Sequence, residues 1–199
     1  MNTTPPIVVG ITGASGAPYA VRLLQQLTAA HRSVSLIVSK YGMRLLATEM
    51  GIESMDALRN AVGKDAWDSC VETYGNDDRG ASPASGSALT AGMIVCPCSM
   101  GTLSAISVGA SRSLIERAAD VTLKERRKLV LVPRETPLSA IHLENMLRLA
   151  RAGAVVMPAS PGFYHRPKQI SDLIDFVVAR MLDHLGVEHQ LVKRWDSPT

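Results

Sequence analysis

Five short runs of apolar residues constrain the fold of this 199-residue chain more than any other feature. They are rich in Val, Ile and Leu and lie at residues 7–11, 34–38, 93–95, 129–132 and 154–157. Such runs are typical of parallel strands that are covered on both faces. Helix-like patterns alternate with them, at residues 18–30, 43–50, 102–119 (with a break near Gly109), 137–152 and 172–185. This alternation predicts an α/β domain with helices on both sides of the sheet.

The length of the chain favours one domain, since a domain commonly takes roughly 150 residues. Hydrophobic residues make up 46% and charged residues 20% of the chain, as in ordinary folded proteins. We predict a single Rossmann-like (flavodoxin-like) three-layer αβα domain with a mostly parallel sheet over residues 1–185. A C-terminal arm is expected over residues 186–199. Residues 75–91 are rich in Gly, Ser, Ala and Asp and are expected to form a long loop within the domain.

Capping signals mark the starts of the last two predicted helices. Thr136 is expected to cap the first of them, with Pro137 at the first helical position and Gly153 just beyond the end. Ser171 is expected to cap the last helix, whose apolar stripe leaves Arg180 on its flank.

Composition argues against several classes of function. Aromatic residues make up only 4% of the chain, too few for a surface on which single-stranded nucleic acid stacks, and the net charge is only +3. No apolar run approaches the roughly 18 residues of a membrane span, and no leader pattern precedes the first strand. Cys70, Cys96 and Cys98 lack the spacing of redox or zinc motifs and are expected to be reduced and buried. We expect a cytoplasmic protein that binds neither nucleic acid nor a membrane.

Small, hydroxyl-bearing or cationic residues follow every predicted strand. They lie at residues 10–17 (GITGASGA), 39–40 (SK), 98–102 (CSMGT), 133–135 (PRE) and 159–162 (ASPG). Because the carboxyl ends of parallel strands meet at one edge of the sheet, we expect these segments to converge and to form a cradle for a phosphate group. The glycine spacing is GxxGxxG, neither the GxGxxG of dinucleotide sites nor GxxxxGK[ST]. This spacing favours a mononucleotide such as FMN over NAD or ATP.

Several charged residues are candidates for catalysis. Glu49 lies near the end of the second predicted helix, and Glu135 follows a strand, where a simple ion pair is an equal alternative. Arg117 and Asp120 fall on neighbouring helical turns and are expected to form a surface pair. The basic run at residues 124–128 is expected to be solvated, with at most one or two members facing a site.

The sequence contains no motif for a metal-binding site and none for a catalytic histidine. His142 and His165 fit neither a Ser/His/Asp arrangement nor HExxH. Asp77 and Asp78 lack the second acidic cluster of a magnesium-dependent diphosphate site. We therefore expect a metal-free mechanism.

Nine segments of the chain form a recognisable set. They are residues 10–17 (GITGASGA), 38–40 (VSK), 47–49 (ATE), 83–87 (PASGS), 96–102 (CPCSMGT), 116–127 (ERAADVTLKERR), 129–137 (LVLVPRETP), 142–146 (HLENM) and 161–167 (PGFYHRP). Together they resemble the UbiX-type flavin prenyltransferases, and the resemblance runs from residue 7 to residue 195. The joint occurrence of ERAAD, LKER, PRE and PGFYH is specific, whereas GASG alone is shared with FMN-dependent cysteine decarboxylases. Some relatives carry a Trp just before the PASGS segment, where this chain has NDDRG.

The resemblance implies an enzyme that uses reduced FMN as a bound substrate. It would join a dimethylallyl group, supplied as dimethylallyl phosphate, to flavin nitrogen five and ring carbon six, without a metal. The product, prenylated FMN, would serve a UbiD-type decarboxylase. The resemblance also implies a homo-oligomer, with a dodecamer as one candidate, in which neighbouring subunits can contribute residues to a site.

The resemblance further assigns residues to the two ligands. Those expected to hold FMN are Gly13, Ala14, Ser15, Ser39, Ser99, Met100, Gly101, Thr102 and Arg134. Those expected to hold dimethylallyl phosphate are Lys124, Tyr164 and Arg180, with Arg117 nearby. Those expected to be catalytic are Ser15, Glu49 and Glu135 in proton transfer, Lys124 in neutralising the departing phosphate, and Trp195 as a π face for the allyl cation.

Two other functions stay open at this point. An FMN-dependent decarboxylase, acting on aromatic acids or on cysteine-type substrates, would use the flavin as a redox cofactor and would not need Lys124, Tyr164 and Arg180. A non-catalytic FMN-binding module would need the GASG and SMGT loops but neither Lys124 nor Glu135. The sequence also leaves open whether the donor is a monophosphate or a diphosphate.

Overall fold

The computed structural model describes residues 4–193 and contains one sheet of six parallel strands. The strands are β1 (Ile7–Ile11), β2 (Val34–Val38), β3 (Val71–Tyr74), β4 (Gly92–Cys98), β5 (Leu129–Pro133) and β6 (Val155–Val156). Their order across the sheet is β3-β2-β1-β4-β5-β6, which is the strand order of the Rossmann fold. The connection after β1 leads to β2 on one side, whereas the connection after β4 leads to β5 on the other side. A crevice is therefore expected beyond the carboxyl ends of β1 and β4.

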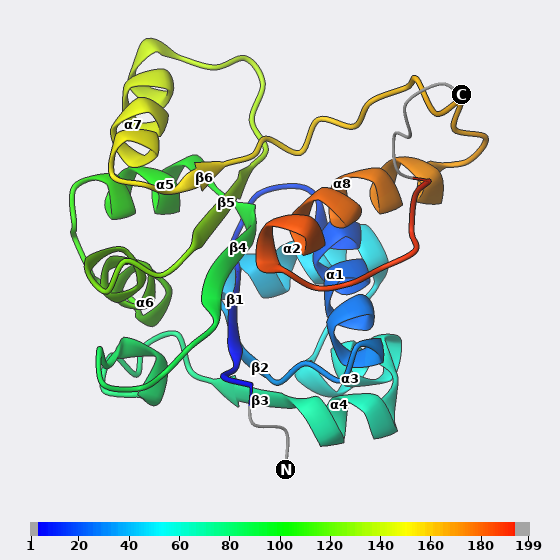
Figure 1. Ribbon diagram of the computed structural model, residues 1–199, viewed down its shortest axis with the longest axis horizontal. Coiled ribbons are helices and arrows are strands. Elements are labelled where there is room, and N and C mark those ends of the chain that lie inside the picture. The colour runs from blue at the N-terminus through cyan, green and yellow to red at the C-terminus, as the bar shows by residue number, and fades with distance from the viewer. Residues whose placement is uncertain (1–3, 194–199) are drawn as a thin grey trace.

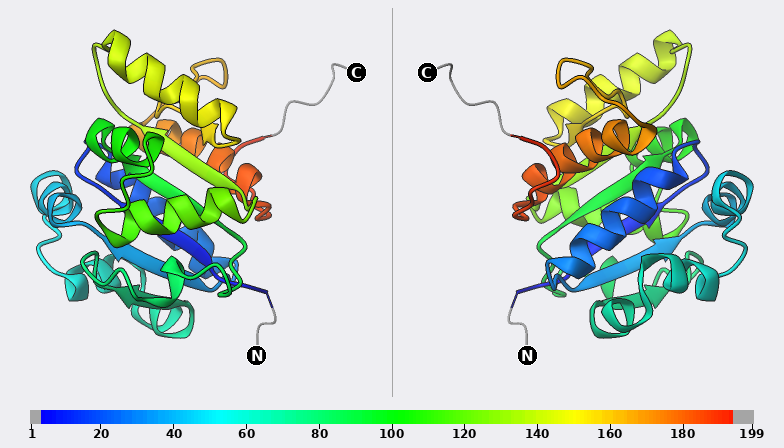
Figure 2. Two further views of the ribbon diagram at one scale, coloured as in Figure 1. Left: turned by 90° about the vertical axis from the view of Figure 1, so that its left-hand side faces the viewer. Right: turned by 90° about the vertical axis from the view of Figure 1, so that its right-hand side faces the viewer.

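Helices cover both faces of the sheet (Figures 1 and 2). One face is covered by α1 (Ala17–Ala29) and α8 (Ile170–Leu185), and the same core takes side chains from α2 (Lys40–Met50), α3 (Met55–Val62) and α4 (Lys64–Cys70). The other face is covered by α5 (Met100–Ser107), α6 (Leu114–Lys124) and α7 (Ala140–Arg151). The predicted three-layer αβα architecture is confirmed.

The alternation of side chains along β1 divides the core between the two helical layers. Ile7, Val9 and Ile11 are buried against the layer that contains α1 and α8. Val8 is buried against the layer that contains α5 and α6. Every residue of β1, β4 and β5 is buried. This double burial is the reason that these strands read as continuous apolar runs.

Three elements were not predicted from the sequence. The edge strand β3 exposes Glu72 and Thr73, so it shows no apolar run, and the short helices α3 and α4 are separated only by Gly63. The predicted loop at residues 75–91 contains a 3₁₀ turn at Ser82–Ala84 and no strand or α-helix.

Both predicted helix caps are wrong. The helix α7 begins at Ala140, because the Ser139 hydroxyl accepts a hydrogen bond from the His142 N–H (3.2 Å) and His142 Nδ1 accepts one from the Ser139 N–H (3.3 Å). Thr136 and Pro137 lie before this helix. The helix α8 begins before Ser171, because the Asp172 carboxylate accepts hydrogen bonds from the backbone N–H groups of residues 168 and 169.

None of the helices between residues 4 and 193 is both long enough and apolar enough to cross a lipid bilayer.

Candidate functional site

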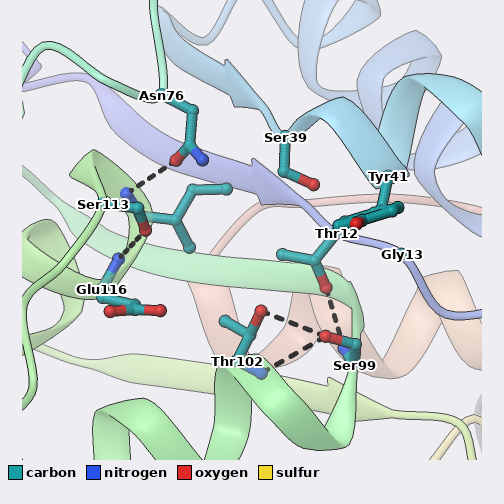
Figure 3. Close-up of a pocket in the computed structure, with 10 residues that line it drawn as sticks. Thr12, Gly13, Ser39, Tyr41, Asn76, Ser99, Thr102, Ser113 and Glu116 are labelled. Carbon is teal, nitrogen blue, oxygen red and sulfur yellow. Dashed lines mark hydrogen bonds between the residues drawn. The ribbon is translucent and has the colours of Figure 1, made fainter.

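A polar cavity of 230 Å³ opens beyond the carboxyl ends of β1, β2 and β4 (Figure 3). Three of the five segments that were expected to converge line it, namely residues 10–17, 39–40 and 98–102, whereas residues 133–135 and 159–162 do not line it. The residues that line it are Thr12, Gly13, Ser39, Tyr41, Asn76, Ser99, Thr102, Ser113, Ile115 and Glu116. The cavity thus contains four of the residues expected to hold FMN: Gly13, Ser39, Ser99 and Thr102.

The N-termini of α2 and α5 point into this cavity through their cap residues. The Ser39 hydroxyl accepts a hydrogen bond from the Gly42 N–H (3.0 Å), and the Ser99 hydroxyl accepts one from the Thr102 N–H (3.3 Å). Within the described residues, the N–H groups at the first two positions of each helix have no partner in the chain. A helix N-terminus carries partial positive charge, and here two of them with unpaired donors meet. The cavity therefore suits an anion such as a phosphate group.

The N-termini of α1 and α6 are also near this edge of the sheet, but protein side chains satisfy them. Glu49 Oε2 accepts hydrogen bonds from the N–H groups of Gly16 (2.9 Å) and Ala17 (2.8 Å), at the start of α1. Asn76 does the same for α6, since its Oδ1 accepts from the Ile115 N–H (3.2 Å) and its backbone oxygen accepts from the Leu114 N–H (2.8 Å). The N–H groups at these two helix starts are therefore already bonded, whereas those at the first two positions of α2 and α5 have no partner within residues 4–193.

The walls of the cavity are held together by close backbone contacts. A Cβ atom on Gly13 would lie 2.5 Å from the Cβ of Tyr41, and one on Gly42 would lie 2.5 Å from the carbonyl oxygen of Ile11. Thr12 is buried and ties the β1 loop to the β4 loop, because its hydroxyl donates to the Pro97 carbonyl (2.9 Å) and accepts from the Ser99 N–H (2.8 Å).

A second group of expected residues lies beside the GASG loop. Arg134, at the end of β5, reaches across so that its Nε donates to the Ser15 carbonyl oxygen (3.4 Å). Glu49 holds the next residue of the same loop, as described above. Glu135 is exposed, and its carboxylate accepts a hydrogen bond from the Thr136 N–H (3.1 Å). Ser15 thus lies in a loop that is fixed from both sides.

Comparison with known proteins decides the family. A family model described as Flavoprotein matches residues 1–182. The flavin prenyltransferase UbiX of Pseudomonas aeruginosa is 49% identical to the chain, over 98% of the chain and 96% of that protein. The chain belongs to the UbiX flavin prenyltransferase family. The predicted resemblance is therefore confirmed, and so is the expectation of a prenyltransferase.

Solved structures of UbiX family members have the same fold. AnUbiX, solved in complex with FMN and dimethylallyl pyrophosphate, superposes with a TM-score of 0.90 at 41% identity, and covers 98% of this chain and 100% of that chain. A dodecameric FMN-dependent UbiX-like decarboxylase from Escherichia coli O157:H7 gives a TM-score of 0.88 at 44% identity, over 96% of this chain and 100% of that chain.

The residues expected to hold dimethylallyl phosphate do not line the cavity of this UbiX family member. Lys124 is ion-paired with Glu125, and Arg117 forms the expected pair with Asp120 (2.7 Å). Arg180 is paired with Asp183 (3.1 Å). Tyr164 is 68% exposed and meets the ring of Phe176 edge-on at 5.6 Å between centroids. Trp195 lies outside the described residues.

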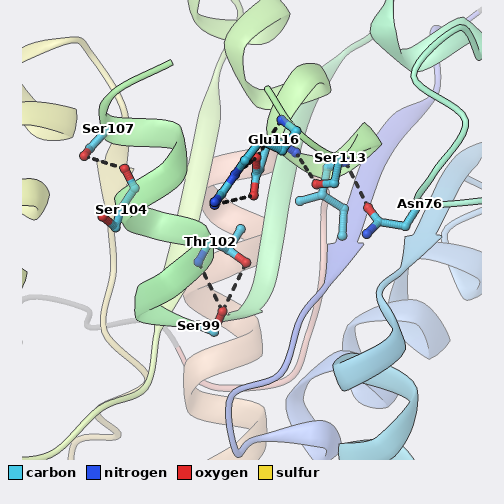
Figure 4. Close-up of polar contacts among 9 residues, drawn as sticks. Asn76, Ser99, Thr102, Ser104, Ser107, Ser113 and Glu116 are labelled. Carbon is cyan, nitrogen blue, oxygen red and sulfur yellow. Dashed lines mark hydrogen bonds and ion pairs between the residues drawn. The ribbon is translucent and has the colours of Figure 1, made fainter. Parts of the chain in front are cut away.

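Several residues of the cavity were missed by the sequence analysis. Asn76 and Ser113 are the clearest, and Figure 4 shows them side by side at the start of α6. Glu116 is only 8% exposed and accepts a hydrogen bond from the Arg112 N–H (2.7 Å). The spacing Ser113-x-x-Glu116 is a capping signal that could have placed a helix start here. Nothing in the sequence pointed to Asn76.

The two buried thiols of the chain are inert. Cys96 and Cys98 on β4 are fully buried and free. Burial raises the pKa of the Cys98 thiol to about 12 and raises the pKa of Cys96 as well. Both thiols are therefore protonated at neutral pH, and a protonated thiol is neither a nucleophile nor a metal ligand. Within residues 4–193, no group of His, Cys, Asp and Glu side chains is arranged to hold a metal ion.

Proposed function

We propose that this chain transfers the dimethylallyl group of dimethylallyl phosphate or diphosphate to reduced FMN. The allylic carbon–oxygen bond breaks and the phosphate leaves with its electron pair, while the five-carbon unit bonds to flavin nitrogen five and ring carbon six. Two flavin protons are displaced and one proton adds to the allyl double bond. The observation that carries the proposal is the anion cavity between α2 and α5 in a chain that is 49% identical to a flavin prenyltransferase.

The phosphate of FMN is proposed to bind between the N-termini of α2 and α5. Ser39 and Thr102 place hydroxyl groups there. The unpaired backbone N–H groups in the first turns of α2 and α5 are further hydrogen-bond donors for the phosphate. The cavity volume of 230 Å³ is below the range of about 300–1,000 Å³ that is typical of whole small-molecule sites. The ring end of FMN therefore lies outside the cavity, on the side of Ala14, while Met100 and Gly101 contribute their backbone N–H groups to the phosphate.

Ser15, Glu49, Arg134 and Glu135 are proposed to serve the ring end of the flavin. Glu49 holds two backbone N–H groups and Arg134 holds the Ser15 carbonyl, so the Ser15 hydroxyl is presented from a rigid loop. Proton transfer at the ring requires a hydroxyl or carboxyl group within hydrogen-bond reach. Ser15 and Glu135 supply these groups, and Glu49 keeps the loop in place.

Lys124, Tyr164 and Arg180 are proposed to hold the donor, with Arg117 near its phosphate and Trp195 against the allyl group. Cations beside the departing phosphate stabilise the charge that develops as the carbon–oxygen bond breaks. Because Lys124, Tyr164 and Arg180 do not line the cavity of their own chain, we propose a homo-oligomer in which they reach the FMN site of a neighbouring copy. The dodecameric relative from Escherichia coli supports this assembly.

The product is proposed to leave the site and to serve a UbiD-type decarboxylase in the cytoplasm. Prenylated FMN is a modified cofactor, and the proposal assigns its use to this second protein.

The test is an anaerobic incubation of the protein with reduced FMN and either dimethylallyl phosphate or dimethylallyl diphosphate in parallel. Mass spectrometry of the released flavin should show the addition of one five-carbon unit with at least one of the two donors. Unmodified flavin with both donors would remove the prenyltransferase proposal and return the decarboxylase and the FMN-binding module to consideration.

A further inference from the structure

Three side chains at the end of α8 are joined in a row. Arg180 Nη1 donates to Asp183 Oδ2 at 3.1 Å, and Asp183 Oδ1 lies 3.2 Å from His189 Nε2. The side chain of His189 is only 2% exposed, that of Asp183 is 24% exposed and that of Arg180 is 56% exposed. The row therefore runs from a buried imidazole, through a partly buried carboxylate, to a cation at the surface.

The hydrogen bonds of His189 fix its tautomer and its direction. The Leu191 N–H donates to His189 Nδ1 at 3.4 Å, so Nδ1 is an acceptor and the ring proton is on Nε2. The Nε2–H group then donates to Asp183. Val187 and Leu191 pack on the core beside α8, so the segment that carries His189 is anchored. One oxygen of Asp183 is thus held from the protein interior, and the other accepts the hydrogen bond from Arg180.

Arg180 keeps donors available for a second ligand. Within the described residues, its Nε and Nη2 groups make no hydrogen bond. Arg180 and Asp183 line a surface hollow of 510 Å³ together with Gly186, Val187 and Glu188. A planar guanidinium held by one edge can present its remaining N–H groups to two oxygens of a phosphate.

We propose that Asp183 is a positioning residue for Arg180 in donor binding, and that His189 fixes Asp183 for this task. The inference rests on the proposed function, in which Arg180 binds the phosphate of the donor. A free arginine side chain loses rotamer freedom when it binds a phosphate. Asp183 orders this side chain before the donor arrives, so less freedom is lost on binding.

The Arg180–Asp183 pair contributes little to stability, because the Arg180 side chain is exposed and water screens such a pair. Arg180→Ala should therefore leave the thermal midpoint nearly unchanged. Asp183→Ala also removes the acceptor of the buried His189 Nε2–H group, so it should lower the thermal midpoint.

The experiment measures KM for dimethylallyl phosphate, kcat, FMN affinity and the thermal midpoint in the full-length protein. Asp183→Ala should raise KM by about threefold to tenfold, the loss expected when one long side chain must be ordered on binding, with FMN affinity unchanged. In an Arg180→Ala background, Asp183→Ala should raise KM no further, because the arginine that Asp183 positions is gone.

His189→Leu should raise KM as Asp183→Ala does. His189→Gln should keep KM near the wild-type value, because the glutamine amide can donate to Asp183. The control is Asp68→Asn, which breaks the exposed ion pair with Arg59 and should leave KM unchanged.

Two results would overturn the inference. If Asp183→Ala leaves KM unchanged or lowers it while Arg180→Ala raises it, then Asp183 does not position Arg180, and the donor role of Arg180 stands. If Arg180→Ala has no effect on KM, then the proposed donor site itself is wrong, and the inference falls with it. If His189→Leu does not fold, the Asp183 and Arg180 variants decide alone.

Discussion

At the scale of single residues, Glu49 and Asn76 show how side chains select where an anion binds. Each satisfies the N-terminus of one helix, so that the unpaired N–H groups at this edge of the sheet belong to α2 and α5. The GASG loop is conspicuous in the sequence, yet its helix start is occupied by a carboxylate of the same chain. The proposed phosphate cradle is therefore formed by Ser39, which follows β2, and Ser99, which follows β4.

Glu49→Ala tests the role of this carboxylate. The substitution leaves the N–H groups of Gly16 and Ala17 without an acceptor, so we expect a loss of about 1 kcal/mol in the free energy of unfolding. Because the loop that carries Ser15 is then loosened, turnover should also fall. Urea unfolding and the rate of flavin modification measure the two effects. Wild-type values for both would show that Glu49 does not hold the loop.

His184, on the last turn of α8, gives a prediction about pH. Burial lowers the pKa of His184, and the neighbouring charges of Arg180 and Lys128 lower it further. The unfolded chain therefore binds a proton at this residue more readily than the folded chain does. The stability that this difference provides is complete above pH of about 6.5 and is lost as the pH falls from there through the folded pKa.

His184→Gln removes this titration. The wild-type protein should lose more stability than the variant between pH 7.5 and pH 5.5, as measured by urea unfolding at both values. Equal losses in the two proteins would contradict the assigned pKa shift.

At the scale of secondary structure elements, the site is built from the starts of helices. Ser39 caps α2 next to the cavity, and Ser54 caps α3 away from it, with hydrogen bonds of nearly the same length (3.0 and 3.1 Å). The two caps should contribute similarly to folding. Only the first should contribute to binding a phosphate.

Ser39→Ala and Ser54→Ala form a matched pair of variants. Each should lower the free energy of unfolding by about 1 kcal/mol. Ser39→Ala should also weaken FMN binding by roughly tenfold, since a hydrogen bond to a charged group is lost, while riboflavin, which has no phosphate, should bind both variants alike. Fluorescence titration with FMN and with riboflavin measures this. An equal loss of FMN affinity in both variants would place the phosphate elsewhere.

The elements also explain how far the sequence could predict the structure. The buried strands β1, β2, β4 and β5 were predictable because both of their faces are covered, and β3 was not, because Glu72 and Thr73 face solvent. Ser39 and Ser99 were predictable as site residues because each directly follows a strand. Ser113 follows no strand, and Asn76 comes from a long loop, so only the folded chain brings them to the cavity.

In the whole molecule, the residues proposed for FMN and for the donor have separate partners. Arg134 donates to the GASG loop, whereas Arg180 is paired with Asp183 on α8. The proposed site combines the two groups from two copies of the chain, so the proposal makes assembly a condition for activity.

Mixed oligomers test this arrangement. At a donor concentration well below KM, Arg134→Ala and Arg180→Ala should each have strongly reduced activity alone, because each lacks one proposed ligand contact in every site. Co-expression should restore part of the activity, since some sites then combine an intact Arg134 from one copy with an intact Arg180 from its neighbour. A mixture that stays inactive, with mixed oligomers verified by native mass spectrometry, would mean that both residues act from the same chain.

Quantifying both products of a single turnover tests directly whether the allyl group is transferred to the flavin. The protein, in excess over reduced FMN, is mixed without oxygen with dimethylallyl phosphate or, in parallel, with dimethylallyl diphosphate. Released phosphate or diphosphate and prenylated flavin are quantified in the same samples over time. We predict that the two appear in equal amounts, because the bond to phosphate breaks only as the allyl group is transferred. Phosphate release without flavin modification, or flavin that stays unmodified throughout, would contradict the account.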